Sequence, residues 1–278
     1  MITKEQQEQF ELENKRIADN ISQIKHRIVV FSGKGGVGKT TVSVNLSYGL
    51  HVHGFKTGIL DADITGPNVP KMMGIKGEVH TKDDKIIPQD SRGVKVISMA
   101  NLLPPDKAVV WRGPMRSKMI NEFLGNVNWG DLDFIVADLP PGTGDESLTI
   151  AQSMKPDMAI IVTTPQEVSL IDSARAINMA KEMNIPEIVL VENMSGLICP
   201  NCGQRIDLFG SGGGKKQAEE MNIPFLGAIP INLEARKLAD NGKSIIIENK
   251  EADISIAIYQ IVTEIEKIFK SHLNDKSN

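Results

Sequence analysis

The sequence alternates short apolar runs with helical stretches, and this alternation limits the folds open to it. Seven runs rich in Val, Ile and Leu read as strands: 27–32, 57–63, 94–99, 133–140, 158–165, 187–193 and 224–230. Continuous apolar runs are typical of parallel strands that are buried on both faces. Helical patterns follow most of them, at 145–154, 167–184, 215–221 and 232–240. The sequence therefore predicts an α/β fold, a mostly parallel twisted sheet of about seven to eight strands with helices on both faces.

Composition narrows the class of protein. Of the 278 residues, 41% are hydrophobic and 24% are charged, and the net charge is −4. A negative net charge offers no overall basic field to nucleic acid or to an anionic membrane surface. The polar start "MITKEQQEQFELENKR" is unlike a secretory signal, and no apolar run approaches the ~20 residues that cross a bilayer. We therefore expect a cytoplasmic protein that has neither nucleic acid nor membrane as a partner.

A glycine-rich loop follows the first apolar run. Residues 33–40, "GKGGVGKT", satisfy the P-loop pattern between a predicted strand and a predicted helix. Glycines let backbone N–H groups surround a phosphate, and the N-terminus of the next helix adds a favourable dipole. Lys39 would neutralise β- and γ-phosphate oxygens, and Thr40 would bind Mg²⁺. The predicted nucleotide-binding residues of this loop are Gly33, Lys34, Gly35, Gly36, Val37, Gly38, Lys39, Thr40 and Thr41.

Carboxylates stand at the ends of two further predicted strands, where α/β proteins place ligands. In "LDADITGP", Asp61 and Asp63 are two residues apart, so one can face Mg²⁺ or its waters and the other the attacking water. In "FIVADLPPGTGD", Asp138 follows an apolar run, as does an aspartate that holds a Mg²⁺-bound water. We expect Asp61 and Asp138 to serve the metal, and Asp63 to join Lys39 in hydrolysis. The alternative is a purely structural carboxylate, such as a helix cap.

The rest of the chain completes the predicted organisation. Residues 65–93, rich in Gly, Lys and Asp, look like an insertion with a small hairpin, and 254–269 reads as a closing helix. We divide the chain into an N-terminal helical extension (1–26), a single P-loop NTPase domain (27–272) with a CxxC loop at 194–214, and a disordered tail (273–278).

Both cysteines of the chain lie three positions apart, in "GLICPNCGQR". Cys199 and Cys202 can bind one soft metal centre, but two thiolates do not complete a tetrahedral site. The remaining ligands must come from elsewhere. From the residues alone, a structural zinc, an iron–sulfur cluster and a redox-active dithiol all stay open.

Eight blocks in the same order give the chain a family resemblance. They are "VFSGKGGVGKTT", "DADITGPNVP", "WRGPM" (111–115), "DLPPGTGDESLT", "TTPQEVSLID", "VENMSGLICPNCG", "FGSGGG" (209–214) and "GAIP" (227–230). The chain resembles the Mrp/ApbC class of iron–sulfur cluster carrier ATPases, within the MinD/ParA-like P-loop group. The resemblance covers about residues 27–244, nearly the whole predicted fold.

The resemblance implies a homodimer that binds ATP and Mg²⁺, hydrolyses ATP slowly, and carries a [4Fe–4S] cluster to apo iron–sulfur proteins. Cys199 and Cys202 match the CPxC pair of the family, so two chains would supply four thiolates. Lys34 matches the extra lysine of the deviant Walker A loop, which reaches the nucleotide of the partner and would be catalytic. Asn193 would contact the adenine, and the loop after Pro230 would close over it.

Other functions are open to a chain with these motifs. One is a MinD- or ParA-like positioning ATPase with a structural zinc at the CxxC pair. Such a protein would need a basic membrane helix or a basic DNA-binding patch, and the helix at 252–270 is not basic. Another is a P-loop enzyme that transfers phosphate to a small molecule. The positioning role itself does not explain the cysteine pair. The phosphate-transferring enzyme would need a small-molecule acceptor, whereas a carrier hydrolyses ATP slowly without one.

Overall fold

The computed structural model describes residues 4–63, 66–102, 113–142 and 144–275. The helices are α1 (Lys4–Ile21), α2 (Lys39–Val52), α3 (Val69–Met72), α4 (Gly113–Asn126), α5 (Asp145–Met154), α6 (Glu167–Glu182), α7 (Gly213–Glu220), α8 (Leu233–Asp240), α9 (Ile245–Glu248) and α10 (Asp253–Asp275). The strands are β1 (Ile24–Phe31), β2 (Thr57–Asp61), β3 (His80–Lys82), β4 (Lys85–Ile87), β5 (Gln89–Ser91), β6 (Val94–Ser98), β7 (Leu132–Asp138), β8 (Met158–Thr163), β9 (Glu187–Ile198), β10 (Arg205–Ile206) and β11 (Phe225–Ile231).

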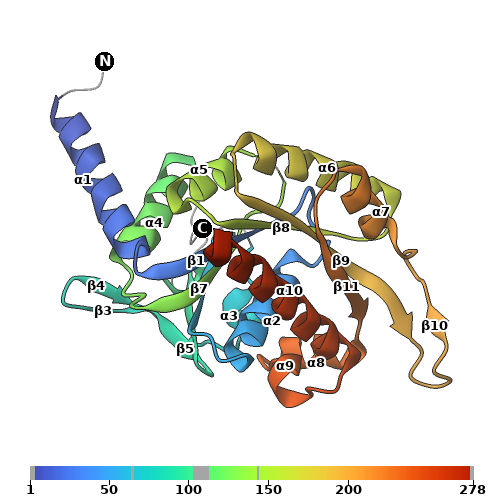
Figure 1. Ribbon diagram of the computed structural model, residues 1–278. Helices are drawn as coiled ribbons and strands as arrows, with labels where there is room; N and C mark the ends of the chain where they lie inside the picture. The colour runs from blue at the N-terminus through green and yellow to red at the C-terminus, as the bar shows by residue number, and fades with distance from the viewer. Residues whose placement is uncertain (1–3, 64–65, 103–112, 143, 276–278) are drawn as a thin grey trace.

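One twisted sheet forms the centre of the molecule (Figure 1). Seven parallel strands run in the order β11-β9-β8-β1-β7-β2-β6, and short antiparallel strands join at β5 and β10. All seven predicted strands are present, which confirms the α/β prediction, and the two antiparallel additions bring the sheet to nine strands. A separate β3–β4 hairpin lies in the predicted insertion. Because β1 lies between β7 and β8, the loop that follows it opens at the middle of the sheet.

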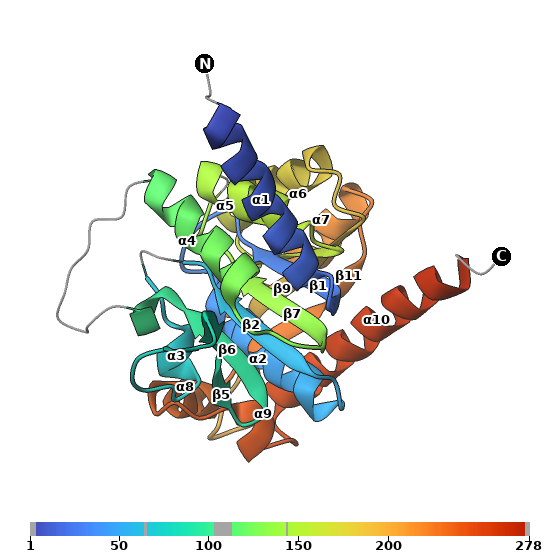
Figure 2. The same cartoon turned by 90° about the vertical axis from the view of Figure 1, so that its left-hand side faces the viewer.

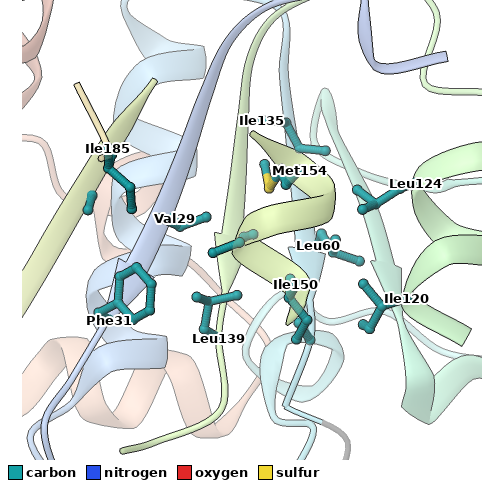
Figure 3. Close-up of a cluster of buried hydrophobic side chains, with 14 of the residues drawn as sticks. Val29, Phe31, Leu60, Ile120, Leu124, Ile135, Leu139, Ile150, Met154 and Ile185 are labelled. Atoms are coloured by element: carbon teal, nitrogen blue, oxygen red, sulfur yellow. The ribbon is translucent and has the colours of Figure 1, made fainter. Parts of the chain in front are cut away.

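Helices cover both faces of this sheet, and successive residues of β1 point to opposite sides. Val29 and Phe31 join the core beneath α1, α4, α5, α6 and α7, part of which Figure 3 shows. Ile28 and Val30 join the second core, beneath α2, α3, α8, α9 and α10. The continuous apolar runs of the sequence are therefore explained by burial on two sides.

Several elements differ from the ranges that the sequence predicts, and β9, for example, continues past residue 193 to Ile198. Strand β1 begins at Ile24, so the last residues of segment 1–26 belong to the central sheet. Helix α4 was not predicted at all. Helix α10 continues past 269 to Asp275, so residues 273–275 are helical rather than part of a disordered tail, and 276–278 lie outside the described residues. This extra length projects from the body (Figure 2), and a pair between Lys270 and Glu266, with nitrogen and oxygen 3.1 Å apart, joins neighbouring turns where it begins.

None of the helices in the described ranges combines the length and the apolarity that a membrane crossing requires.

Candidate functional site

The glycine-rich loop connects β1 to α2, as the sequence predicts. Gly38 has a φ of +81°, and a Cβ there would lie 2.2 Å from Asn193 Nδ2, so both the backbone and the neighbour require glycine. At the start of the loop, a Cβ on Gly33 would lie 2.0 Å from the carbonyl oxygen of Asp172. Helix α6 therefore passes directly against the loop.

Asp138 brings three side chains of α2 together. It is fully buried at the end of β7 and accepts hydrogen bonds from Lys39 Nζ, Thr40 Oγ1 and Ser43 Oγ, each at 2.7 Å. Lys39 and Thr40 are the residues that the P-loop pattern assigns to phosphate and Mg²⁺, so the predicted metal carboxylate lies at the predicted phosphate site. Ser43 was not predicted, but it stands one helical turn beyond Lys39 and orients the same carboxylate.

Asp61 lies beside Asp138, because the two residues pair in register on neighbouring strands. It is fully buried and accepts hydrogen bonds from Ser98 Oγ at 2.9 Å and from the N–H of Val69 at 3.3 Å. Burial, followed by the charge of Asp138, raises the pKa of Asp61 to about 8. Asp63 is only partly buried and accepts a hydrogen bond from the N–H of Gly66. The carboxyl groups of Asp61 and Asp63 therefore have different environments, as the different roles predicted for them require.

A cavity of about 520 Å³ opens next to the P-loop. Thr40 and Thr41 line it from α2, Asn193 from β9 and Pro230 from β11. Asn193 Nδ2 also donates a hydrogen bond to the carbonyl oxygen of Val37 at 2.8 Å, so this side chain contacts the P-loop as well as the cavity. Residues that the family resemblance assigned to the nucleotide thus converge from distant parts of the chain. Their contact with adenine stays a prediction.

The cysteines lie at the tip of a hairpin formed by β9 and β10 (Figure 1). Cys202 is exposed and Cys199 is partly exposed. The backbone N–H groups of Cys202 and Asn201, followed by the thiol of Cys202, lower the pKa of Cys199, which favours the thiolate that binds metals. Within the described ranges, no group of three or more His, Cys, Asp or Glu side chains is arranged to hold a metal ion.

Lys34 is partly exposed and forms none of the ion pairs found among the described residues. Gly35 and Gly36 are exposed beside it. In "WRGPM", residues 111 and 112 lie outside the described residues.

A family model described as NUBPL iron-transfer P-loop NTPase, of the ParA group, matches residues 23–266. A protein named iron-sulfur cluster carrier protein from Pyrococcus horikoshii is 52% identical over 244 residues, which is 84% of this chain and 83% of that protein. A protein of the same name from Aquifex aeolicus is 43% identical, over 90% of this chain and 70% of that one.

Two solved structures share the fold of this chain. A nucleotide-binding protein from Archaeoglobus fulgidus, solved in complex with ADP, has a TM-score of 0.76 and 42% identity, over 86% of this chain and 94% of that chain. The cell division protein MinD from Aquifex aeolicus has a TM-score of 0.64 at 22% identity, over 87% and 97% of the two chains, and so shares the fold. Because the family model covers residues 23–266 and the Pyrococcus horikoshii protein is 52% identical over 84% of this chain, the chain belongs to the NUBPL iron-transfer P-loop NTPase family.

Proposed function

We propose that this protein is an ATP-binding and ATP-hydrolysing iron–sulfur cluster carrier. Two copies would hold one [4Fe–4S] cluster between them and transfer it to apo iron–sulfur proteins. The single observation that carries the proposal is the exposed CxxC hairpin on the same chain as a complete P-loop site. Membership of an iron-transfer family supports it.

The donor set argues for two chains around one cluster. A [4Fe–4S] cluster takes four thiolates, and the chain contains two cysteines. A twofold axis beside the hairpin would supply the other two. Exposed apolar side chains surround the hairpin, at Ile198, Ile206 and Leu208. Contact with a second copy would remove this apolar surface from water.

ATP is the proposed substrate of the buried site. Lys39 would bind the β- and γ-phosphates, while Thr40 and Asp138 would hold Mg²⁺ directly or through water, with Asp61 behind them. Asp63 lies nearer the solvent and would orient the attacking water. Lys34 would reach the nucleotide of the partner. The cavity lined by Asn193 and Pro230 would receive the base and the ribose.

Metal analysis after anaerobic reconstitution tests the cluster. The wild-type protein should take up about two irons per chain and absorb near ~400 nm, because four irons are shared by two chains. Cys199→Ala should abolish this uptake and leave ATP hydrolysis in place. One zinc per dimer without iron uptake would reject the carrier and favour a structural zinc site.

Hydrolysis and transfer need separate tests. Phosphate release from Mg·ATP without any acceptor should be slow, and it should disappear in Lys39→Ala. Cluster transfer should appear as activity gained by an apo iron–sulfur enzyme that is mixed with the loaded protein. Sedimentation of the loaded protein should give a mass of two chains. A monomer with a full cluster would contradict the shared site.

A further inference from the structure

Strand β9 links the nucleotide cavity to the cysteine hairpin, and neighbouring residues on it face opposite sides of the sheet. Asn193 lines the cavity and donates to Val37 of the P-loop. Glu192 points the other way and is fully buried. Glu192 does not line the nucleotide cavity, and a buried carboxyl group requires hydrogen-bond partners.

Glu192 has three such partners, and all of them donate. Its Oε1 accepts from Ser195 Oγ at 2.7 Å and from the N–H of Gly212 at 3.1 Å, and its Oε2 accepts from the N–H of Gly214 at 2.6 Å. Gly212 is the N-cap of α7 and Gly214 is its second residue, so both N–H groups belong to the helix N-terminus, where a negative charge is favourable. Ser195 belongs to the base of the cysteine hairpin. One carboxyl group therefore ties the hairpin to the loop before α7.

Further hydrogen bonds lead from Ser195 through Arg205 and Asp207 back to the loop before α7, so that the contacts form a closed ring. Arg205, on β10, donates through Nη2 to the carbonyl oxygen of Ser195 at 3.2 Å and through Nε to Asp207 Oδ1 at 2.8 Å. Asp207 begins the loop that returns to Gly212, and Ser211 Oγ donates to its Oδ2 at 3.4 Å. We refer to Glu192, Ser195, Arg205, Asp207, the 207–212 loop and the first turn of α7 as the hairpin ring.

The backbone between the cavity and the hairpin ring is irregular. Ile229 and Ile231 of β11 are two residues apart, but they pair with Asn193 and Leu197, which are four apart, so β9 bulges here. Met194 has a φ of +57° and Gly196 has a φ of +80° inside this bulge. Met194 also lines the cavity. The bulge at 194–196 therefore touches the nucleotide cavity on one side and the hairpin ring on the other.

We propose that Glu192 is a positioning residue that couples the nucleotide cavity to the cysteine pair through the bulge at 194–196. A ligand that displaces Asn193 or Met194 moves the bulge, and the hairpin ring passes this movement to the hairpin that carries Cys199. Figure 1 shows the arrangement, with β9 continuing past α7 and β11 into the β10 hairpin. The inference deepens the proposed function, because it explains how a nucleotide acts on the cluster ligands.

Thiol reactivity tests the coupling without any cluster. In reduced, metal-free protein that carries Cys202→Ala, an aromatic disulfide reagent reports on Cys199 alone. Saturating Mg·ADP or a non-hydrolysable Mg·ATP analogue should change the rate of this reaction by about fivefold or more. A change of this size is typical of the coupling between two sites in one protein. Glu192→Gln should remove the nucleotide effect. Both carboxyl oxygens of Glu192 accept hydrogen bonds, whereas the NH₂ group of a glutamine cannot accept one. Nucleotide affinity should stay within about threefold of the parent value.

Two further variants keep the test decisive. Ser195→Ala removes only the hydrogen bond between Ser195 Oγ and Glu192, so it should also reduce the nucleotide effect. This variant replaces Glu192→Gln in the test if Glu192→Gln does not fold. Asp157→Asn is the matched control, because this carboxyl also accepts three hydrogen bonds, all from Arg27, at the opposite end of the sheet. It should retain the full nucleotide effect. Loss of the effect in this control would mean that general destabilisation, rather than coupling, explains the result.

The outcomes separate this inference from the proposed function. If the parent protein takes up iron but Cys199 does not respond to nucleotide, or if Glu192→Gln and Ser195→Ala respond as the parent does, the coupling is refuted and the carrier stands. If the parent takes up no iron but Cys199 responds and Glu192→Gln abolishes the response, the carrier is refuted and the coupling stands.

Discussion

Replacing Asp61 by Asn should stabilise the nucleotide-free protein at neutral pH while it impairs ATP hydrolysis. Burial and the neighbouring Asp138 raise the pKa of Asp61 to about 8, whereas the bonds from Ser98 and Val69 and the charge of Lys39 act in the opposite direction. In the unfolded chain an aspartate has a pKa of about 3.9. At pH 7, folding therefore places a proton on Asp61 that the unfolded chain does not carry.

The sign and the size of the effect follow from this proton. Between about pH 4 and pH 8 the native state binds one proton more than the unfolded state, so raising the pH favours unfolding. The contribution of Asp61 is fully present below about pH 4 and is lost at about 1.4 kcal/mol per pH unit up to about pH 8. At pH 7 the loss is about 4 kcal/mol, from which about 1 kcal/mol for one lost hydrogen bond is subtracted in Asp61→Asn. The variant should therefore gain about 3 kcal/mol.

Urea unfolding from pH 5 to pH 9 in buffer without Mg²⁺ and nucleotide measures this difference. Subtracting the wild-type curve from the Asp61→Asn curve cancels the titration of all groups that the two proteins share. The difference in the free energy of unfolding should rise with pH and level off near pH 8. A difference that stays flat between pH 5 and pH 8, or a variant that is less stable at every pH, would refute the reasoning.

Other perturbations separate the nucleotide site, the cysteine pair and the core. Lys39→Ala or Asp63→Ala should abolish phosphate release from Mg·ATP but leave iron uptake intact, while Cys199→Ala should do the reverse. In protein that carries Cys202→Ala, the rate of thiol alkylation should rise with a midpoint below the usual cysteine pKa of about 8.5, because N–H groups favour the Cys199 thiolate. Trp129→Ala should lower the free energy of unfolding by about 3–5 kcal/mol in urea, since this side chain is fully buried.

The sequence predicted the strands better than the ends of the helices. A parallel strand that is buried on both faces needs an apolar side chain at nearly every position. Each such strand therefore appears in the sequence as a continuous apolar run. Helix α4 was missed although Ile120, Phe123, Leu124 and Val127 have helical spacing and are buried. Along α1, Ile17 and Ile21 pack in the core, but Phe10 is 60% exposed because the helix extends beyond the body it packs on (Figure 2).

Site residues could be predicted where a motif fixes their spacing and not where the fold brings them together. Lys39, Thr40 and Asp138 were expected in one site, and they contact one another. Ser43 carries no motif of its own, and its role depends on the direction in which α2 leaves the loop. The sequence contains one indication of the role of Glu192, which is the position of this acidic residue near the end of the apolar run "EIVLVEN". Such a residue indicates a buried partner, but only the fold identifies that partner.

Strand β9 is longer than its neighbour β8, and the cysteine hairpin lies beyond the end of β8. Strand β9 pairs with β8 only as far as Glu192, opposite Thr163, yet it continues to Ile198. Six further residues, at about 3.3 Å each, carry the hairpin up to about 20 Å past the end of β8. In the proposed ATP complex the phosphates would bind at Lys39, at the carboxyl end of β1, whereas the thiolates lie at the tip of the hairpin that β9 and β10 form. Under the proposed function, the bulge at 194–196 and the second chain are two routes from the nucleotide to the cluster, and a monomeric variant that keeps the nucleotide effect on Cys199 would favour the bulge.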